Sequence, residues 1–242
     1  MTQLKIFEIF YSLQGESSRM GWPTIFIRLS GCPMRCHYCD TAYAFQGGSM
    51  MDIEDIMTSI KKYDTRYVTV TGGEPLAQKE VHNLLKTLAD SNYEVSIETG
   101  GGLSIKEVDP RIKIILDIKT PESGEENKNH WENLAIIESK DEIKFVLCSR
   151  EDYDWAKKIL DQYKLTQKCS VLFSPVYQKL LDQHPDFAKN PEALLGLANA
   201  QIQLALIPEA KKSLKDLIKK YPKSDVIQNA QKRLKVLESI KP

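Results

Sequence analysis

Three cysteines, Cys32, Cys36 and Cys39, lie close together in the segment CPMRCHYC. Thiolates bind zinc and iron–sulfur clusters, so this spacing indicates a metal centre. Three kinds of centre are compatible with it. A zinc site would need a fourth ligand, for which His37 is available. A cluster held by four thiolates would need another cysteine nearby, and the segment has none. Three thiolates on a four-iron cluster would leave one iron open to a small ligand.

The sequence around this segment indicates alternating strands and helices. These elements must position the cysteines. Short β-branched runs predict strands, and longer stretches with apolar residues three and four apart predict helices. Such alternation predicts a parallel sheet, whose ligand sites lie at the carboxyl ends of the strands. CPMRCHYC, TGGEP (71–75) and ETGGG (98–102) each follow a predicted strand. The expected strands are 24–30, 67–70, 94–98, 113–118, 142–147 and 169–173, and the expected helices are 52–63, 78–91, 130–139 and 151–164.

Two polar features in this frame point to ligand binding. Arg28 lies between Ile27 and Leu29, so its side chain faces away from theirs, and a charge within an apolar strand needs a partner. The glycines of TGGEP allow backbone groups to approach a small polar ligand, although an ordinary strand-to-helix turn would also use them.

The C-x3-C-x2-C spacing, with Tyr38 before the last cysteine and TGGEP downstream, resembles the radical S-adenosylmethionine (SAM) superfamily. Several further segments resemble the 7-carboxy-7-deazaguanine synthases across residues 1–177: FYSLQGES, IFIRLSGCPMRCHYCDTAYAF, ETGG, LDIKTP, KFVLCSREDYDWA and VLFSPVY. The resemblance implies a partial parallel (β/α) barrel. It also implies a 4Fe-4S cluster, SAM and Mg2+ as cofactors, and conversion of 6-carboxy-5,6,7,8-tetrahydropterin to 7-carboxy-7-deazaguanine with loss of ammonia.

The resemblance also implies roles for individual residues. Cys32, Cys36 and Cys39 would hold the cluster, and Thr41 would bind magnesium, which prefers oxygen ligands. The residues implied to bind the pterin are Leu13, Gln14, Gly15, Arg28 and Thr71. Those implied to bind SAM are Tyr38, Cys39, Asp40, Gly73, Asp117, Ile118, Lys119, Phe173, Ser174, Pro175 and Val176. An electron donor such as flavodoxin and a homodimer are expected on the same ground.

Composition bears on location and partners. Basic and acidic residues number 33 each, so the chain has no net positive charge that would favour binding to nucleic acid. The sequence has neither an apolar stretch long enough to predict a membrane span nor an N-terminal secretory pattern. Clustered cysteines suit a reducing compartment, so we expect a cytoplasmic protein.

The chain changes character after Tyr177. The segment 178–242 has 12 basic and seven acidic residues and one of the 12 glycines. Its apolar residues recur with a helical repeat, and it resembles the C-terminal tetratricopeptide repeats of the Tol-Pal cell division coordinator. We therefore expect a catalytic domain over 1–177 and an all-helical tail over 178–242.

The tail stands where the synthases have a different ending, and ETGG stands where they usually have ETSG. The coincident change in charge, glycine usage and periodicity at Tyr177 supports a second hypothesis: a fusion of two genes that is inactive or impaired and acts as a helical-repeat interaction protein.

Overall fold

The computed structural model describes residues 3–176, 190–203 and 207–239. The chain separates into two compact units, Met1–Val176 and Tyr177–Pro242. The first residues of the expected tail, 178–189, lie outside the described residues. No described helix is long and apolar enough to cross a membrane.

The first unit is built on an eight-stranded sheet with the order β3-β1-β2-β4-β5-β6-β7-β8. From β2 to β8 all neighbouring strands are parallel, as predicted. The strands are β1 (Gln3–Leu13), β2 (Pro23–Leu29), β3 (Ser49–Asp52), β4 (Tyr67–Gly72), β5 (Glu94–Thr99), β6 (Lys113–Ile118), β7 (Glu142–Leu147) and β8 (Ser170–Pro175).

Two strands were not predicted. β1 and β3 pair antiparallel at one end of the sheet and extend it beyond the parallel part. The alternation that begins β1 is interrupted at the register irregularity between Ile6 and Glu8, and β3 has only four residues, so neither shows the sustained alternation by which sequence analysis finds strands. The fold is therefore a mixed sheet rather than a purely parallel one.

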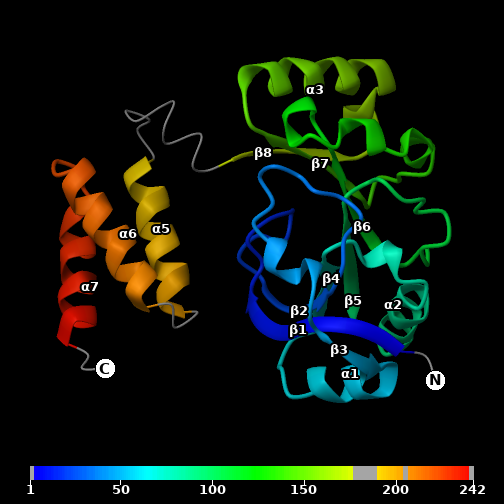
Figure 1. Ribbon diagram of the computed structural model, residues 1–242, viewed down its shortest axis with the longest axis horizontal. Helices are drawn as coiled ribbons and strands as arrows, with labels where there is room; N and C mark the ends of the chain where they lie inside the picture. Colours follow the sequence, from blue (N-terminus) through cyan, green and yellow to red (C-terminus); the bar gives the residue numbers. More distant parts are fainter. Residues whose placement is uncertain (1–2, 177–189, 204–206, 240–242) are drawn as a thin grey trace. The chain divides into compact units, whose positions relative to one another are not determined.

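Three helices support this sheet: α1 (Ile53–Ile60), α2 (Val81–Asp90) and α3 (Arg150–Tyr163). In Figure 1, α1 lies beside β1 and β3, α2 beside β5, and α3 beside β7. Their apolar residues, such as Ile56, Leu85 and Ile159, join the strand residues Ile27 and Phe145 in one core. The prediction of a helix over 130–139 is wrong, because that region forms only a short 3-10 helix, Trp131–Ala135.

The second unit is helical, as expected for the tail. It contains α5 (Asn190–Gln203), α6 (Ile207–Lys220) and α7 (Ile227–Ser239). α6 packs against both α5 and α7. Leu194, Ala198, Leu214, Leu217 and Ala230 are buried in the hydrophobic cluster of this unit.

Candidate active site at the carboxyl edge of the sheet

The cysteine segment lies in the loop that follows β2. Cys32, Cys36 and Cys39 carry free thiols, and each is partly buried. The backbone N–H of Met34 donates to Cys32 Sγ at 3.4 Å, which turns the chain around that thiol. Burial raises the pKa values of Cys32 and Cys36. Bound metal would favour their thiolate forms.

The loop is fastened to the segment 121–128, more than 80 residues away in sequence. The backbone N–H of His37 donates to the carbonyl of Ser123 at 3.0 Å, and that of Arg35 donates to Glu125 Oε1 at 2.6 Å. The ring of His37 is occupied by the same segment, since its Nδ1 lies 3.2 Å from the carbonyl oxygen of Glu122. This contact orients the His37 ring through Nδ1.

The glycines after β4 permit two backbones to meet. A Cβ atom at Gly73 would overlap the carbonyl oxygen of Gly31, and one at Gly72, whose φ is +135°, would overlap the backbone of Leu29. The N–H of Gly73 donates to the carbonyl of Leu29 at 3.0 Å, and that of Glu74 to Gly31 at 2.8 Å. The TGGEP turn therefore packs directly on the start of the cysteine loop.

Glu74 joins this turn to the next one. Its side chain is buried and accepts hydrogen bonds from the backbone N–H of Gly100 at 2.7 Å, from Thr99 Oγ1 at 2.9 Å and from the N–H of Leu76 at 3.0 Å. Burial raises the pKa of Glu74. The turns after β2, β4 and β5 thus form one connected edge.

One face of the sheet carries polar side chains near this edge. Parallel pairing places Arg28 opposite Thr71 and Asp117 opposite Lys144. The Thr71 hydroxyl donates to Glu98 Oε2 at 3.0 Å, which continues the polar row from β4 to β5. The alternating residues on the other face belong to the apolar core.

Arg28 lies at one end of this row, with 16% of its side chain exposed. Its Nε donates to Glu8 Oε1 at 2.8 Å. Its guanidinium also lies over the ring of Phe10, 5.5 Å from the centroid. The sequence predicted that Arg28 needs a partner. Glu8, on a strand that the sequence pattern did not reveal, is one such partner.

The SLQGE segment reaches the middle of the row. Gln14 is buried, with 4% exposure, and its Nε2 lies 3.2 Å from Thr69 Oγ1 and 3.4 Å from Glu98 Oε1. Gln14, Thr71 and Glu98 are therefore brought together, although they come from three separate parts of the chain. Burial raises the pKa of the Glu98 carboxyl.

Asp117, Lys119 and Tyr38 form a second polar group. Asp117 Oδ2 lies 3.0 Å from Lys119 Nζ, and that nitrogen lies 5.8 Å from the centroid of the Tyr38 ring. Burial opposes the charge of Lys119, but Asp117, Cys36 and Glu74 together raise the pKa of Lys119. Among the described residues, Asp117 Oδ1 and the Tyr38 hydroxyl are buried oxygens without a hydrogen-bond partner. Buried polar atoms are normally paired, so both are candidates to bind a ligand.

The other predicted residues are more scattered. Leu13 at the end of β1 and Gly15 in the loop after it are exposed, and Ile118 belongs to the core. Thr41 is partly buried, and its Oγ1 donates to Asp40 Oδ1 at 2.7 Å.

The final strand carries the last group of predicted SAM contacts. Phe173 faces the apolar side, where its ring lies 5.8 Å from that of Phe145 and 5.6 Å from that of Tyr153. Ser174 pairs with Val146, and Pro175 with Leu147. Val176 follows the strand, and its N–H donates to the carbonyl of Leu147 at 2.9 Å. The Phe173 ring is thus directed away from the polar row.

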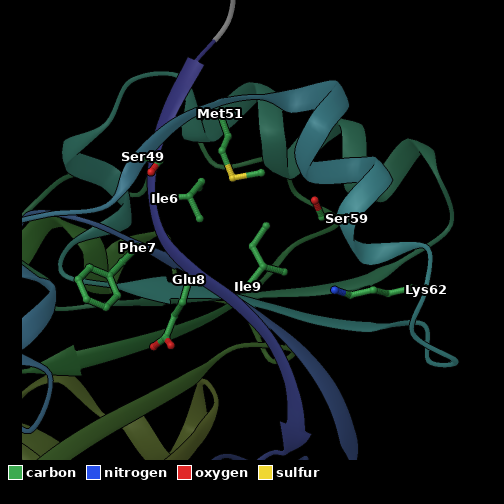
Figure 2. Close-up of a pocket in the computed structure, with 8 residues that line it drawn as sticks. All are labelled: Ile6, Phe7, Glu8, Ile9, Ser49, Met51, Ser59 and Lys62. Atoms are coloured by element: carbon green, nitrogen blue, oxygen red, sulfur yellow. The ribbon is translucent and has the colours of Figure 1, made fainter.

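A pocket elsewhere in the first unit has a volume of ≈ 250 Å³. Figure 2 shows Ile6, Ile9 and Met51 gathered on one side of β1, while Phe7 and Glu8 lie on the other. An irregularity in the β1–β2 register between Ile6 and Glu8 accounts for this arrangement. The lining residues include none of the cysteines and none of the predicted ligand-binding residues, but Glu8, which accepts the hydrogen bond of Arg28 Nε, is among them.

Sequence analysis missed Lys144 as a member of the polar row. It occupies the middle of EIKFVL, as Arg28 does in TIFIRLS, and a charge at an alternate position of an apolar strand is the signal that would have identified it. Glu98 was not predicted as a ligand-binding residue, because its partners Gln14 and Thr71 are distant in sequence.

Comparison with known proteins gives consistent matches to the two units. A model of the radical SAM superfamily matches residues 26–164, and a tetratricopeptide repeat model matches residues 175–234. Over 180 residues the chain is 47% identical to the 7-carboxy-7-deazaguanine synthase of Chlorobaculum tepidum, covering 73% of this chain and 82% of that protein. The 7-carboxy-7-deazaguanine synthase of Koribacter versatilis is 42% identical over 179 residues, covering 73% and 79%.

Among solved structures, QueE from Escherichia coli resembles this chain with a TM-score of 0.62 and 24% identity, covering 76% of this chain and 90% of that one. This likeness concerns the fold.

Proposed function

Because the chain belongs to the 7-carboxy-7-deazaguanine synthase family of radical SAM enzymes, we propose that it converts 6-carboxy-5,6,7,8-tetrahydropterin to 7-carboxy-7-deazaguanine with loss of ammonia. The observation that carries this proposal is the polar row that runs from Arg28 through Thr71 and Glu98 to Asp117 and Lys144. It supplies both cationic and anionic groups near the cysteine loop.

The residues present fit the implied cofactors. Three free thiols in one loop match a cluster with one open iron, and the unpaired oxygens of Asp117 and Tyr38 are suited to a polar ligand beside it. When bound, the 4Fe-4S cluster and SAM supply a radical that abstracts hydrogen from the substrate. Cys32, Cys36 and Cys39 would hold the cluster. Gly73, Asp117, Lys119 and the backbone of Phe173 to Val176 would contact SAM.

The chain's own residues bind and orient the pterin. Arg28 contacts Glu8 through Nε, and its terminal nitrogens would form a bidentate pair with the substrate carboxylate. Gln14 and Glu98 offer donor and acceptor atoms to the amide and amino groups of the ring. Leu13, Gly15 and Thr71 would complete this half of the site. Positioning of this kind, together with exclusion of water, is the protein's contribution to catalysis.

Other parts of the proposal concern the magnesium ion, the electron donor and the oligomeric state. Thr41 would place a magnesium ion beside the substrate, with Asp40 orienting its hydroxyl through the 2.7 Å hydrogen bond. We also propose a flavodoxin-type electron donor and a homodimer, as expected for the family.

The test is anaerobic reconstitution with iron and sulfide, followed by incubation with reductant, SAM, Mg2+ and the carboxypterin. We expect several iron atoms per chain and 7-carboxy-7-deazaguanine detected by mass spectrometry. Cys36→Ala should abolish both, whereas Cys148→Ala, which removes a buried thiol outside the loop, should retain the cluster. A colourless zinc protein would contradict the cluster. Formation of 5′-deoxyadenosine without deazaguanine would contradict the proposed conversion and would indicate an intact cofactor half with a broken substrate half.

The second unit supports a further candidate function. The match to a tetratricopeptide repeat model over 175–234 and the three packed helices favour an interaction module in residues 178–242. Binding of a partner that the isolated residues 1–177 do not bind would support this module. A chain that binds partners but shows no SAM cleavage would support the impaired-fusion hypothesis.

A further inference from the structure

Lys144 lies between two carboxylates, those of Glu16 and Asp117. Its Nζ donates to Glu16 Oε2 at 2.6 Å and lies 3.7 Å from Asp117 Oδ2. Its side chain is 13% exposed. Burial opposes its charge, but Asp117, Glu16 and Glu98 together raise the pKa of Lys144. Lys144 is therefore a charged residue whose partners belong to different parts of the site.

Glu16 connects Lys144 to the pterin half of the proposed site. It lies two residues after Gln14, whose side chain contacts Glu98, and its own N–H donates to Gln14 Oε1 at 3.2 Å. About half of the Glu16 side chain is exposed. The position of Glu16 and that of Gln14 are consequently linked through a short stretch of loop.

Asp117 connects Lys144 to the SAM half. One of its oxygens, Oδ2, is shared between Lys119 and Lys144, whereas Oδ1 is buried and has no hydrogen-bond partner among the residues that the structure describes. A ligand that donates to Oδ1 would fix the carboxylate that Lys144 faces. The charge on Lys144 thus acts on both halves at once.

Resting on the proposed function, we propose that Lys144 is a positioning residue that couples SAM binding to pterin binding. A ligand at Asp117 stabilises the arrangement in which Lys144 holds Glu16, and this arrangement places Gln14 against the pterin. By linkage the effect is reciprocal, so each ligand increases the affinity for the other by the same factor. The residue does not touch the reacting atoms.

The experiment uses the full chain with its cluster reconstituted and no reductant, so that both ligands bind without turnover. The dissociation constant of SAM is measured by anaerobic calorimetry with and without saturating 6-carboxytetrahydropterin. For the wild type we expect about fivefold or greater tightening, a typical size for coupling between two sites. Lys144→Gln should reduce this factor to near one, and Lys144→Arg should restore part of it.

Glu16→Gln provides an independent test at a half-exposed position, and it should also remove the coupling. Lys113→Gln is the matched control. Lys113 fastens the same loop to the sheet, through Ser18 Oγ at 3.1 Å and Glu142 Oε1 at 2.8 Å, but it pairs with Glu142 rather than Asp117. Its coupling factor should equal that of the wild type.

The outcomes separate this inference from the proposed function. A wild-type protein that binds SAM but not the pterin overturns the proposed substrate and this inference with it. Binding of both ligands without mutual tightening overturns the coupling alone. Unchanged coupling in Lys144→Gln and Glu16→Gln, or equal loss in Lys113→Gln, overturns the role assigned to Lys144.

Discussion

The carboxylate of Glu74 accepts a hydrogen bond from the backbone N–H of Gly100 at 2.7 Å, which joins the turn after β4 to the turn after β5. Glycine at this position also leaves room for its neighbours. A Cβ there would lie 3.2 Å from Met34 Sδ and 3.3 Å from Glu74 Oε2. The departure from the ETSG pattern is thus accommodated at a crowded point, and the hydrogen bond to Glu74 requires only the backbone of Gly100.

The Thr99 hydroxyl is a second donor to this buried carboxylate, at 2.9 Å. Thr99→Val keeps the shape of the side chain and removes the donor, so it should lower the free energy of unfolding by about 1–3 kcal/mol. Urea denaturation of the apoprotein measures the change. Thr87→Val is the control, because the Thr87 hydroxyl is an exposed donor on α2, and its effect should be within about 0.5 kcal/mol. Equal losses in the two variants would contradict the role of Thr99.

Gly73→Ala should prevent assembly of the cluster, since the added methyl group would displace Gly31 and with it the cysteine loop. Iron content and the visible absorption of reconstituted protein are the measurements. Gly15→Ala is the control for the cluster, because a Cβ at Gly15 meets no atom within 4 Å. A Gly73→Ala protein with the wild-type iron content would show that the loop does not depend on this contact.

Arg28→Lys keeps a positive charge but loses the planar fork of donors. We expect the KM for the carboxypterin to rise about 10- to 100-fold, the equivalent of one or two charge-assisted hydrogen bonds. SAM affinity without pterin should be unchanged. Arg150→Lys, at an exposed pair with Asp154 on α3, should leave KM unaltered. A loss of SAM affinity in Arg28→Lys would place Arg28 in the other half of the site.

Deletion of residues 178–242 should leave iron content and reductive SAM cleavage unchanged, because each unit has its own hydrophobic cluster. Iron analysis and 5′-deoxyadenosine formation are compared between the full and shortened chains. Loss of the cluster on deletion would show that the helical tail supports the catalytic unit.

The sequence by itself determined the parallel strands, the place of the motifs at their carboxyl ends and the helical character of the tail. These features depend on local patterns: alternation of apolar residues, glycine-rich turns and cysteine spacing. Arg28 could be singled out for the same reason, since a charge in an apolar strand is visible without a structure.

Only the tertiary structure decided which residues meet. The Glu74–Gly100 bond, the Glu8–Arg28 pair and the Glu16–Lys144 pair join segments that are 20 to 128 residues apart in sequence. Such contacts depend on strand order and register, which no local pattern specifies. The glycines of TGGEP illustrate the difference: their spacing indicated a close approach, but the fold decided that the approaching group is the backbone of the cysteine loop.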